Sequence, residues 1–160
     1  MADTANSIPD AHGSATPRLL GMRDAFLEAL FPIFQVDKNC VFLSADDGAP
    51  TLDRFVRELP EQFLQIGIAE QQALGMAAGL AVEGKRPFIY AIAPFVTERI
   101  FEFVKLDACA MNLPVIIFGV GAGFSYDIMG PSHHCITDIS LMRTLPNLEI
   151  WSPSDSVCAA

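Results

Sequence analysis

One carboxylate stands out in this sequence by its surroundings: Glu70, in the segment Gly-Ile-Ala-Glu-Gln-Gln at residues 67–72. It follows a short apolar run, begins a stretch of strong helix formers, and has mainly apolar near neighbours. One interpretation is structural, because an acid in the first turn of a helix interacts favourably with the helix dipole. The other is chemical, because an acid removed from water can hold or donate a proton near neutrality. The local pattern alone leaves both open.

An aromatic ring and a histidine pair are the other side chains with chemistry to offer. Phe95 comes soon after an apolar run, where a flat ring can stack on a ligand for about 1 kcal/mol beyond burial. In a chain with 12 phenylalanines a core position is the rival interpretation. His133, His134 and Cys135 are adjacent, and three adjacent residues rarely converge on one metal ion, so we expect no metal site. His133 then either fixes its loop or contacts a substrate.

The elements that must position these residues alternate along the chain. The 160 residues suit one domain, expected over residues 16–160 after a flexible leader at 1–15. Hydrophobic spacing predicts helices and strands in turn, with a charged surface segment at 54–61. The expected helices cover residues 17–34, 69–83, 96–111 and 138–143, and the expected strands cover 40–43, 63–66, 87–92, 114–120 and 148–151. Nearly continuous apolar strands predict an α/β fold, a doubly wound, mostly parallel sheet with helices on both faces.

The carboxyl edge of such a sheet is where ligands bind. Several loops fall at this edge, among them a glycine-rich loop at residues 119–134. They follow the expected strand ends Leu43, Ile66, Ile92 and Val120. We therefore expect the functional site there, with Glu70 and Phe95 on neighbouring segments.

Four motifs in a consistent order, over roughly residues 16–157, resemble the pyrimidine-binding domain of the transketolase family. The first, Gly-Ile-Ala-Glu-Gln with its alanine- and glycine-rich helix, is similar to a signature of transketolases and deoxyxylulose-phosphate synthases. Gly-Pro-Ser-His-His is similar to the family's Gly-Pro-Thr-His-Gln. The others are Leu-Pro-Asn-Leu followed by Ser-Pro-Ser-Asp, and the loop Ser-Ala-Asp with Ala-Pro-Thr. In that order they stand at residues 67–71, 130–134, 145–155 and 44–51.

The resemblance implies a site for thiamine diphosphate. In the family, the glutamate that matches Glu70 hydrogen-bonds a ring nitrogen of the cofactor's aminopyrimidine, whose exocyclic nitrogen then takes the proton from the thiazolium carbon. Phe95 and Phe101 match aromatic positions beside this ring, although Glu98 replaces a further transketolase aromatic. Asp46 lies in the loop after the first strand and is implied as another cofactor contact.

The resemblance also implies substrate contacts. His133 matches a histidine that contacts the donor substrate and can hydrogen-bond a developing alkoxide. Thr51 and Arg18 fall near phosphate-contact positions. Where the family has an aspartate that reads a substrate hydroxyl, this chain has Met129, whose thioether cannot make that hydrogen bond. Asp127 is the candidate to replace it.

A second domain or subunit is implied as well. The family holds the magnesium-bound diphosphate on a separate domain with a Gly-Asp-Gly motif, which this sequence lacks. We therefore expect this chain to be a fragment or one part of a split enzyme. Magnesium is then held by the partner, in a homo- or hetero-oligomer. The hydrophobic content of 51% fits an apolar interface.

Composition excludes several other classes of protein. A net charge of −9 with only 10 basic residues argues against nucleic-acid binding. No apolar run is long enough to span a membrane, and the polar N-terminus does not resemble a signal peptide. The four cysteines form no CxxC pair, which favours reduced thiols in a cytoplasmic protein.

The sequence thus predicts the pyrimidine-domain part of a thiamine-diphosphate-dependent transferase of the transketolase type. It would move two-carbon units between sugar-type or 2-oxo substrates and act only with a partner domain or chain. Alternatives that Met129 keeps open are a beta-type subunit of a 2-oxo acid dehydrogenase and a deoxyxylulose-phosphate-synthase-like enzyme. A non-catalytic scaffold subunit is a further alternative, against which Glu70, Phe95 and His133 argue. A flavodoxin-like or nucleotide-binding module would need a GxGxxG or P-loop motif, which is absent.

Overall fold

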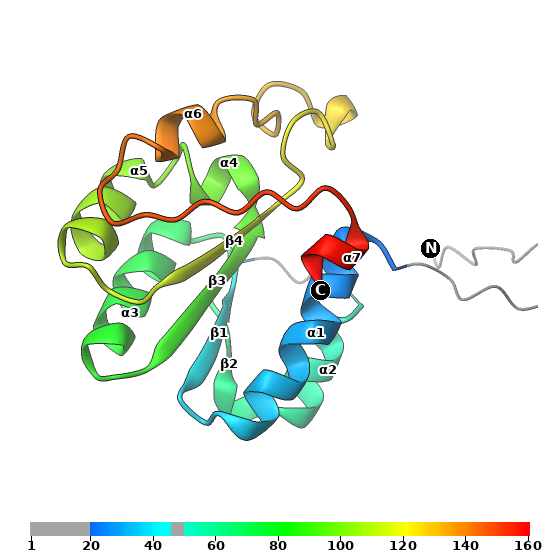
Figure 1. Cartoon of the computed structure of the whole chain (residues 1–160), viewed down its shortest axis with the longest axis vertical. Helices are drawn as coiled ribbons and strands as arrows, with labels where there is room; N and C mark the ends of the chain where they lie inside the picture. Colours follow the sequence, from blue (N-terminus) through cyan, green and yellow to red (C-terminus); the bar gives the residue numbers. More distant parts are fainter. Residues whose placement is uncertain (1–19, 46–49) are drawn as a thin grey trace, which may run out of the picture.

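Parallel strands in the order β2-β1-β3-β4 form the centre of the computed structural model, which describes residues 20–45 and 50–160 (Figure 1). All three neighbouring pairs are parallel, so the predicted α/β fold with a parallel sheet is confirmed. The strands are β1 (Cys40–Ser44), β2 (Phe63–Gln65), β3 (Arg86–Ile92) and β4 (Ile116–Val120). Their carboxyl ends share one edge of the sheet, as the sequence predicted.

Helices cover both faces of the sheet (Figure 1). On one face lie α1 (Met22–Val36) and α2 (Leu52–Glu58), and on the other lies α3 (Glu70–Val82). The short C-terminal helix α7 (Ser156–Ala159) packs against α1. The central strand β1 is buried along its whole length, because its alternate side chains enter two different cores.

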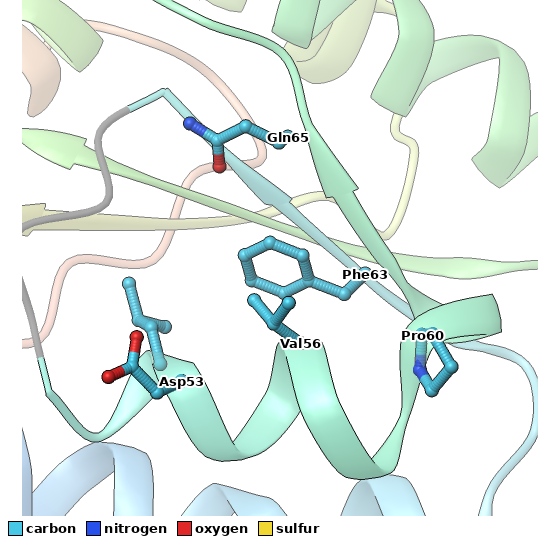
Figure 2. A pocket seen from close by; sticks show the side chains of 6 residues that line it. Asp53, Val56, Pro60, Phe63 and Gln65 are labelled. Atoms are coloured by element: carbon cyan, nitrogen blue, oxygen red, sulfur yellow. The ribbon is translucent and has the colours of Figure 1, made fainter.

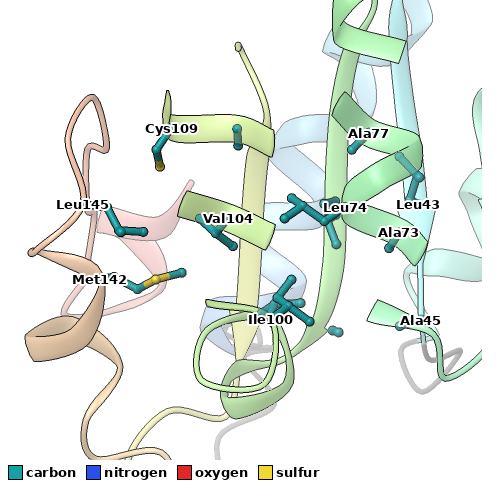
Figure 3. Packing of buried hydrophobic residues seen from close by; sticks show 14 of the residues in the cluster. Leu43, Ala45, Ala73, Leu74, Ala77, Ile100, Val104, Cys109, Met142 and Leu145 are labelled. Carbon is teal, nitrogen blue, oxygen red and sulfur yellow. The ribbon is translucent and has the colours of Figure 1, made fainter. Parts of the chain in front are cut away.

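The two cores differ in the kind of side chain that fills them. Under α1 and α2 the core is rich in phenylalanine, with rings at edge-to-face angles such as Phe31 and Phe55, whose centroids lie 5.1 Å apart. Under α3 it is built from small and aliphatic residues, among them Ala73, Leu74 and Ala77 (Figure 3). Small side chains on this face let α3 lie close to the sheet and carry Glu70 to its edge.

A buried glutamine ties the start of the sheet together. Gln62, 6% exposed, ends the short helix η1 (Pro60–Gln62) just before β2. Its Nε2 donates to the backbone carbonyls of Phe34, Asp37 and Cys40 at 3.1, 3.0 and 3.0 Å. One side chain thereby joins the end of α1 to the start of β1.

The absence of a side chain at Gly119 allows the chain after β3 to pack closely on β4. The chain leaves β3 into a single helical turn, α4 (Ala93–Val96), which packs directly on β4. A Cβ atom at Gly119 of β4 would lie 3.1 Å from the Cα of Ala93. The glycine therefore lets α4 sit against the strand.

Three segments differ in part or in full from the expectation. Residues 54–61 are mostly exposed, as expected for a charged surface segment, but residues 52–58 form the helix α2, whose Leu52 and Phe55 face the core. The single helix expected at 96–111 is interrupted by a turn at 97–100. The chain forms α4 before this turn, and α5 (Phe101–Phe103) and the π-helical segment η2 (Val104–Ala110) after it.

The strand expected at residues 148–151 is a coil, which runs across the molecule from α6 (Asp138–Met142) to α7 (Figure 1). The side chains of residues 149–151 are exposed, and this segment does not pair with a strand of the sheet. The expected leader at 1–15 and the helix start at 16–19 lie outside the described residues.

Two further observations bear on the sequence expectations. All four cysteines are free, and burial raises the pKa of the Cys40, Cys109 and Cys135 thiols. Within the described ranges, every helix is too short or too polar to cross a bilayer.

Candidate functional site

Glu70 is the first residue of α3, at the carboxyl edge of the sheet, and it is only 3% exposed. The chain reaches it from β2 through Gly67, whose φ of +68° lies in the left-handed region that glycine adopts most readily. Its Oε2 accepts a hydrogen bond from Nη1 of Arg99 at 3.1 Å, and the Arg99 side chain is 42% exposed. The carboxylate therefore lies just below the surface, neither in bulk water nor sealed in the core.

Arg99 joins the acid to an aromatic ring. Its Cζ lies 3.9 Å from the ring centroid of Phe95, so the guanidinium stacks on the phenylalanine. The turn after α4 brings the two residues together, because the Arg99 N–H donates to the Pro94 carbonyl at 3.0 Å. Phe95 itself is half-buried. A planar cation thus connects Glu70 and Phe95.

His133 extends the group from a third segment, the loop after β4. Its ring meets that of Phe95 edge to face, with centroids 5.1 Å apart, and the ring of Tyr126 lies 6.1 Å away. The Oγ of Ser132 and Nδ1 of His133 are 3.0 Å apart and share a hydrogen bond. The structure therefore places Glu70, Arg99, Phe95 and His133 in one continuous series of contacts, which we call the edge group.

Bonds to the turn after α4 hold this loop in place. Gly123 and Cys135 exchange two backbone hydrogen bonds, at 2.7 and 2.9 Å. The Sγ of Cys135 lies 3.8 Å from Oγ1 of Thr97, and Thr137 donates a hydrogen bond to Glu98. Buried Cys135 thus has a structural role in fixing His133 beside Phe95.

The residues next to His133 point elsewhere. The Nε2 of His134 lies 3.1 Å from the carbonyl oxygen of Asp127, and its ring contacts Phe124. Because His133, His134 and Cys135 each have different neighbours, they do not converge on one point. In the part of the chain that the structure describes, no group of three His, Cys, Asp or Glu side chains could hold a metal ion.

Asp127, the candidate to replace the missing family aspartate, is engaged within its own loop. Its Oδ1 accepts a hydrogen bond from the backbone N–H of Ile128 at 2.7 Å, at the start of the short helix η3 (Asp127–Met129). Met129 is exposed. The side chains that this loop leaves in solvent are therefore mainly apolar at the positions after Asp127.

The remaining predicted contacts lie apart from the edge group. Thr51 donates a hydrogen bond to Oδ1 of Asp24 at 2.8 Å, near the start of α1. Both residues lie on the face of the sheet that α1 and α2 cover, opposite to α3. Burial opposes ionisation of Asp24, but the hydrogen bonds from Thr51 and Arg23 outweigh it and lower the pKa. Phe101 packs against the aliphatic core. Arg18 and Asp46 lie outside the described residues.

A pocket on this chain lies elsewhere too. It has a volume of about 450 Å³ and lies between α2 and the edge strand β2 (Figure 2). Its lining residues are Leu52, Asp53, Val56, Pro60, Phe63 and Gln65. None of them belongs to the edge group, so this pocket is separate from the candidate site.

Apolar side chains on the same segments as the edge group face solvent. Ile68, Phe124, Ile128 and Ile136 are all exposed. Exposed apolar residues that gather beside a site are typical of a surface that another domain or chain covers.

The sequence analysis assigned no role to Arg99, a member of the edge group, or to Tyr126, whose ring lies 6.1 Å from that of His133. The signal for Arg99 was its position four residues after Phe95, a spacing that can bring a cation onto a ring. Tyr126 had no such signal, because its place depends on the path of the loop after β4.

Comparison with known proteins gives consistent results. Residues 19–160 match the family described as "Transketolase, pyrimidine binding domain". The chain is 39% identical over 139 residues to a subunit of the apulose-4-phosphate transketolase of Phocaeicola vulgatus, covering 86% of this chain and 45% of that protein. It is 35% identical over 153 residues to 1-deoxy-D-xylulose-5-phosphate synthase of Gloeothece citriformis, covering 95% of this chain and 23% of that protein. The chain thus spans less than half the length of these relatives.

Solved structures agree on the fold. A protein described as "Split gene transketolase, inactive beta4 tetramer" superposes with a TM-score of 0.76 at 36% identity, covering 88% of this chain and 45% of that one. The transketolase of Campylobacter jejuni superposes with a TM-score of 0.77 at 21% identity, covering 92% of this chain and 24% of that one. At that lower identity the likeness concerns the fold.

Proposed function

We propose a function from the premise that this chain belongs to the transketolase family, as its pyrimidine-binding domain. The chain binds the aminopyrimidine of thiamine diphosphate through Glu70 and Phe95, and the enzyme containing it transfers two-carbon units. The observation that carries the proposal is the edge group itself. A buried carboxylate and a half-buried aromatic ring lie one planar group apart at the carboxyl edge of the sheet.

The described residues fit the pyrimidine part of the cofactor. The guanidinium of Arg99 is a planar N–H donor that stacks on Phe95 and donates to Glu70, and an aminopyrimidine is a planar group that can make the same two contacts. The described residues do not fit the diphosphate or its magnesium ion, since no metal-ligand group is present among them. We assign those to a partner domain or subunit.

Each residue of this chain then has one task. When bound, thiamine diphosphate supplies a thiazolium that stabilises a carbanion. Glu70 shares a proton with a ring nitrogen of the pyrimidine, in surroundings that exclude water and strengthen this hydrogen bond. Phe95 holds the ring plane. His133, fixed at Nδ1 by Ser132, presents Nε2 to a substrate oxygen that gains negative charge.

The partner completes the site. The exposed apolar residues beside the edge group support a contact with the diphosphate-binding domain or chain, within a homo- or hetero-oligomer. A relative described as one subunit of a transketolase and a structure described as a split-gene tetramer are consistent with such an arrangement. The free cysteines support a location in the cytoplasm.

The test is Glu70→Gln in the full-length protein, assayed with its diphosphate-binding part, thiamine diphosphate and magnesium. Because the amide cannot hold the proton as the acid does, two-carbon transfer should fall about 10²- to 10⁴-fold. The matched control is Glu83→Gln, at the exposed far end of the same helix, which should keep full activity. Full activity in Glu70→Gln would refute the assignment and favour a scaffold.

A second candidate function concerns the donor. Met129 is exposed and has no strong hydrogen-bonding group, and one carboxylate oxygen of Asp127 accepts a hydrogen bond within its own loop. This favours a donor without a hydroxyl at that position, such as a 2-oxo acid, as in a deoxyxylulose-phosphate-synthase-like enzyme or a 2-oxo acid dehydrogenase subunit. Comparing kcat/KM for pyruvate and for a ketose phosphate decides between the two donors.

A further inference from the structure

Arg99 makes both of the contacts that the proposed cofactor ring requires. Its Nη1 donates to Glu70 at 3.1 Å, and its Cζ lies 3.9 Å above the ring of Phe95. A centroid distance of this size is ordinary van der Waals stacking, which leaves no room for another ring on that face. An aromatic ring that stacks on this face and bonds the same carboxylate oxygen would therefore meet the guanidinium.

We infer that Arg99 is a placeholder, which occupies the position of the cofactor's aminopyrimidine and leaves it when the cofactor binds. The inference rests on the function proposed above and adds a competitor within the chain. A guanidinium matches the ring in flatness and in N–H donors, so it satisfies the buried carboxylate of Glu70 and covers Phe95.

The position of Arg99 allows this exchange. Glu70 is 4% exposed at its side chain and cannot move into solvent without unwinding the start of α3, whereas Arg99 is 42% exposed and lies in the turn at residues 97–100. The long, flexible arginine side chain can rotate into water, where its charge is well solvated. The acid therefore stays in place and the cation moves.

The chain contains a matched control for this arrangement. On the opposite face, Arg54 stacks on Phe31 at 3.7 Å and bonds Glu28 at 3.2 Å, so it repeats the same three chemical groups away from the edge group. Arg54→Ala removes a stacked ion pair of the same three groups, in which the carboxylate is 43% exposed. Its effect measures what the loss of such a pair does when no ligand competes for it.

The experiment measures thiamine diphosphate affinity by calorimetry, with magnesium, on the full-length protein and its diphosphate-binding part. Arg99→Ala should tighten binding roughly three- to tenfold, because the cofactor no longer displaces a cation. Arg99→Lys, which keeps the charge but loses the planar fork, should fall between Arg99→Ala and the wild type. Arg54→Ala should leave the affinity within about twofold. Equal or weaker binding in Arg99→Ala overturns the inference.

A second measurement does not depend on a variant that folds. The Nε–H resonance of Arg99 in the wild-type protein should shift and lose intensity through exchange with water when thiamine diphosphate is added, as the side chain enters solvent. An unchanged resonance in the presence of bound cofactor overturns the inference while leaving the proposed function intact. If the wild-type protein binds no cofactor at all, the proposed function fails and the inference fails with it.

Discussion

Removal of Arg99 should destabilise the protein by an amount that depends on Glu70. Arg99→Ala leaves a carboxylate that is 4% exposed without its ion-pair partner. Breaking a fully buried pair costs about 3–5 kcal/mol, and an exposed pair contributes about 0.2–1 kcal/mol. Because Arg99 is 42% exposed, solvent screens the pair, and we expect a loss of about 2 kcal/mol in the free energy of unfolding.

A double-mutant cycle isolates the interaction. Glu70→Gln leaves a cation that water can solvate, so its cost should stay below about 1 kcal/mol, and the double variant should lose about 1 kcal/mol less than the sum of the singles. Urea unfolding at pH 7, without cofactor or magnesium, gives the four free energies. Arg57→Ala, which removes the ion pair between the exposed Arg57 side chain and Glu58, serves as the control. Additivity within about 0.3 kcal/mol would show that Glu70 and Arg99 are not coupled.

Two further predictions concern the frame around the edge group. Gln62→Ala removes the donor to three backbone carbonyls and should cost about 2–4 kcal/mol, read from the urea midpoint, whereas Gln35→Ala on the exposed side of α1 should cost under about 0.5 kcal/mol. Thr51→Val removes a hydrogen bond that lowers the pKa of Asp24, so that pKa should rise toward its ordinary value in a carbon-detected NMR titration. Since the folded-state pKa is the lower one, the stability that this carboxylate contributes is present above the unfolded-state pKa of about 3.9 and is lost as the pH falls through the folded value. An unshifted Asp24 titration, or equal costs for the two glutamine variants, would contradict these assignments.

The sheet could be predicted because its strands are apolar runs, and β1 and most of β3 are buried. Residues 40–43, 87–92 and 114–120 are apolar almost throughout, and each lies within one residue or two of an observed strand. The helix at 70–82 was predicted for a similar reason, since its alanines and leucines are good helix formers as well as core residues. Where burial and propensity agree, the sequence is sufficient.

The errors arose where they disagree. Residues 52–58 carry several charges, yet two apolar side chains three apart are enough to hold a short helix on the core. Leu148 begins an apolar pattern that resembles a strand, but a strand also needs a neighbour with free backbone groups. The pattern of apolar residues within one segment does not show whether such a neighbouring strand is present.

Motifs in the sequence indicated three residues that the structure places together, but not the contacts that join them. The type and place of Glu70, Phe95 and His133 follow from motifs, and the structure brings all three into one group. The link through Arg99 depends on a tight turn at residues 97–100, which interrupts what the sequence presents as a continuous helix. Contacts of this kind depend on where a helix stops, which is the least certain part of any helix prediction.

Gly119 has a role that its own chemistry would not suggest. Because Gly119 has no side chain, α4, which carries Phe95, can pack closely on β4. A methyl group at this position would push α4 and the ring of Phe95 away from β4, while Glu70 on α3 kept its place. Gly119 therefore contributes to the spacing between Glu70 and the ring of Phe95, although it lies in neither of their segments.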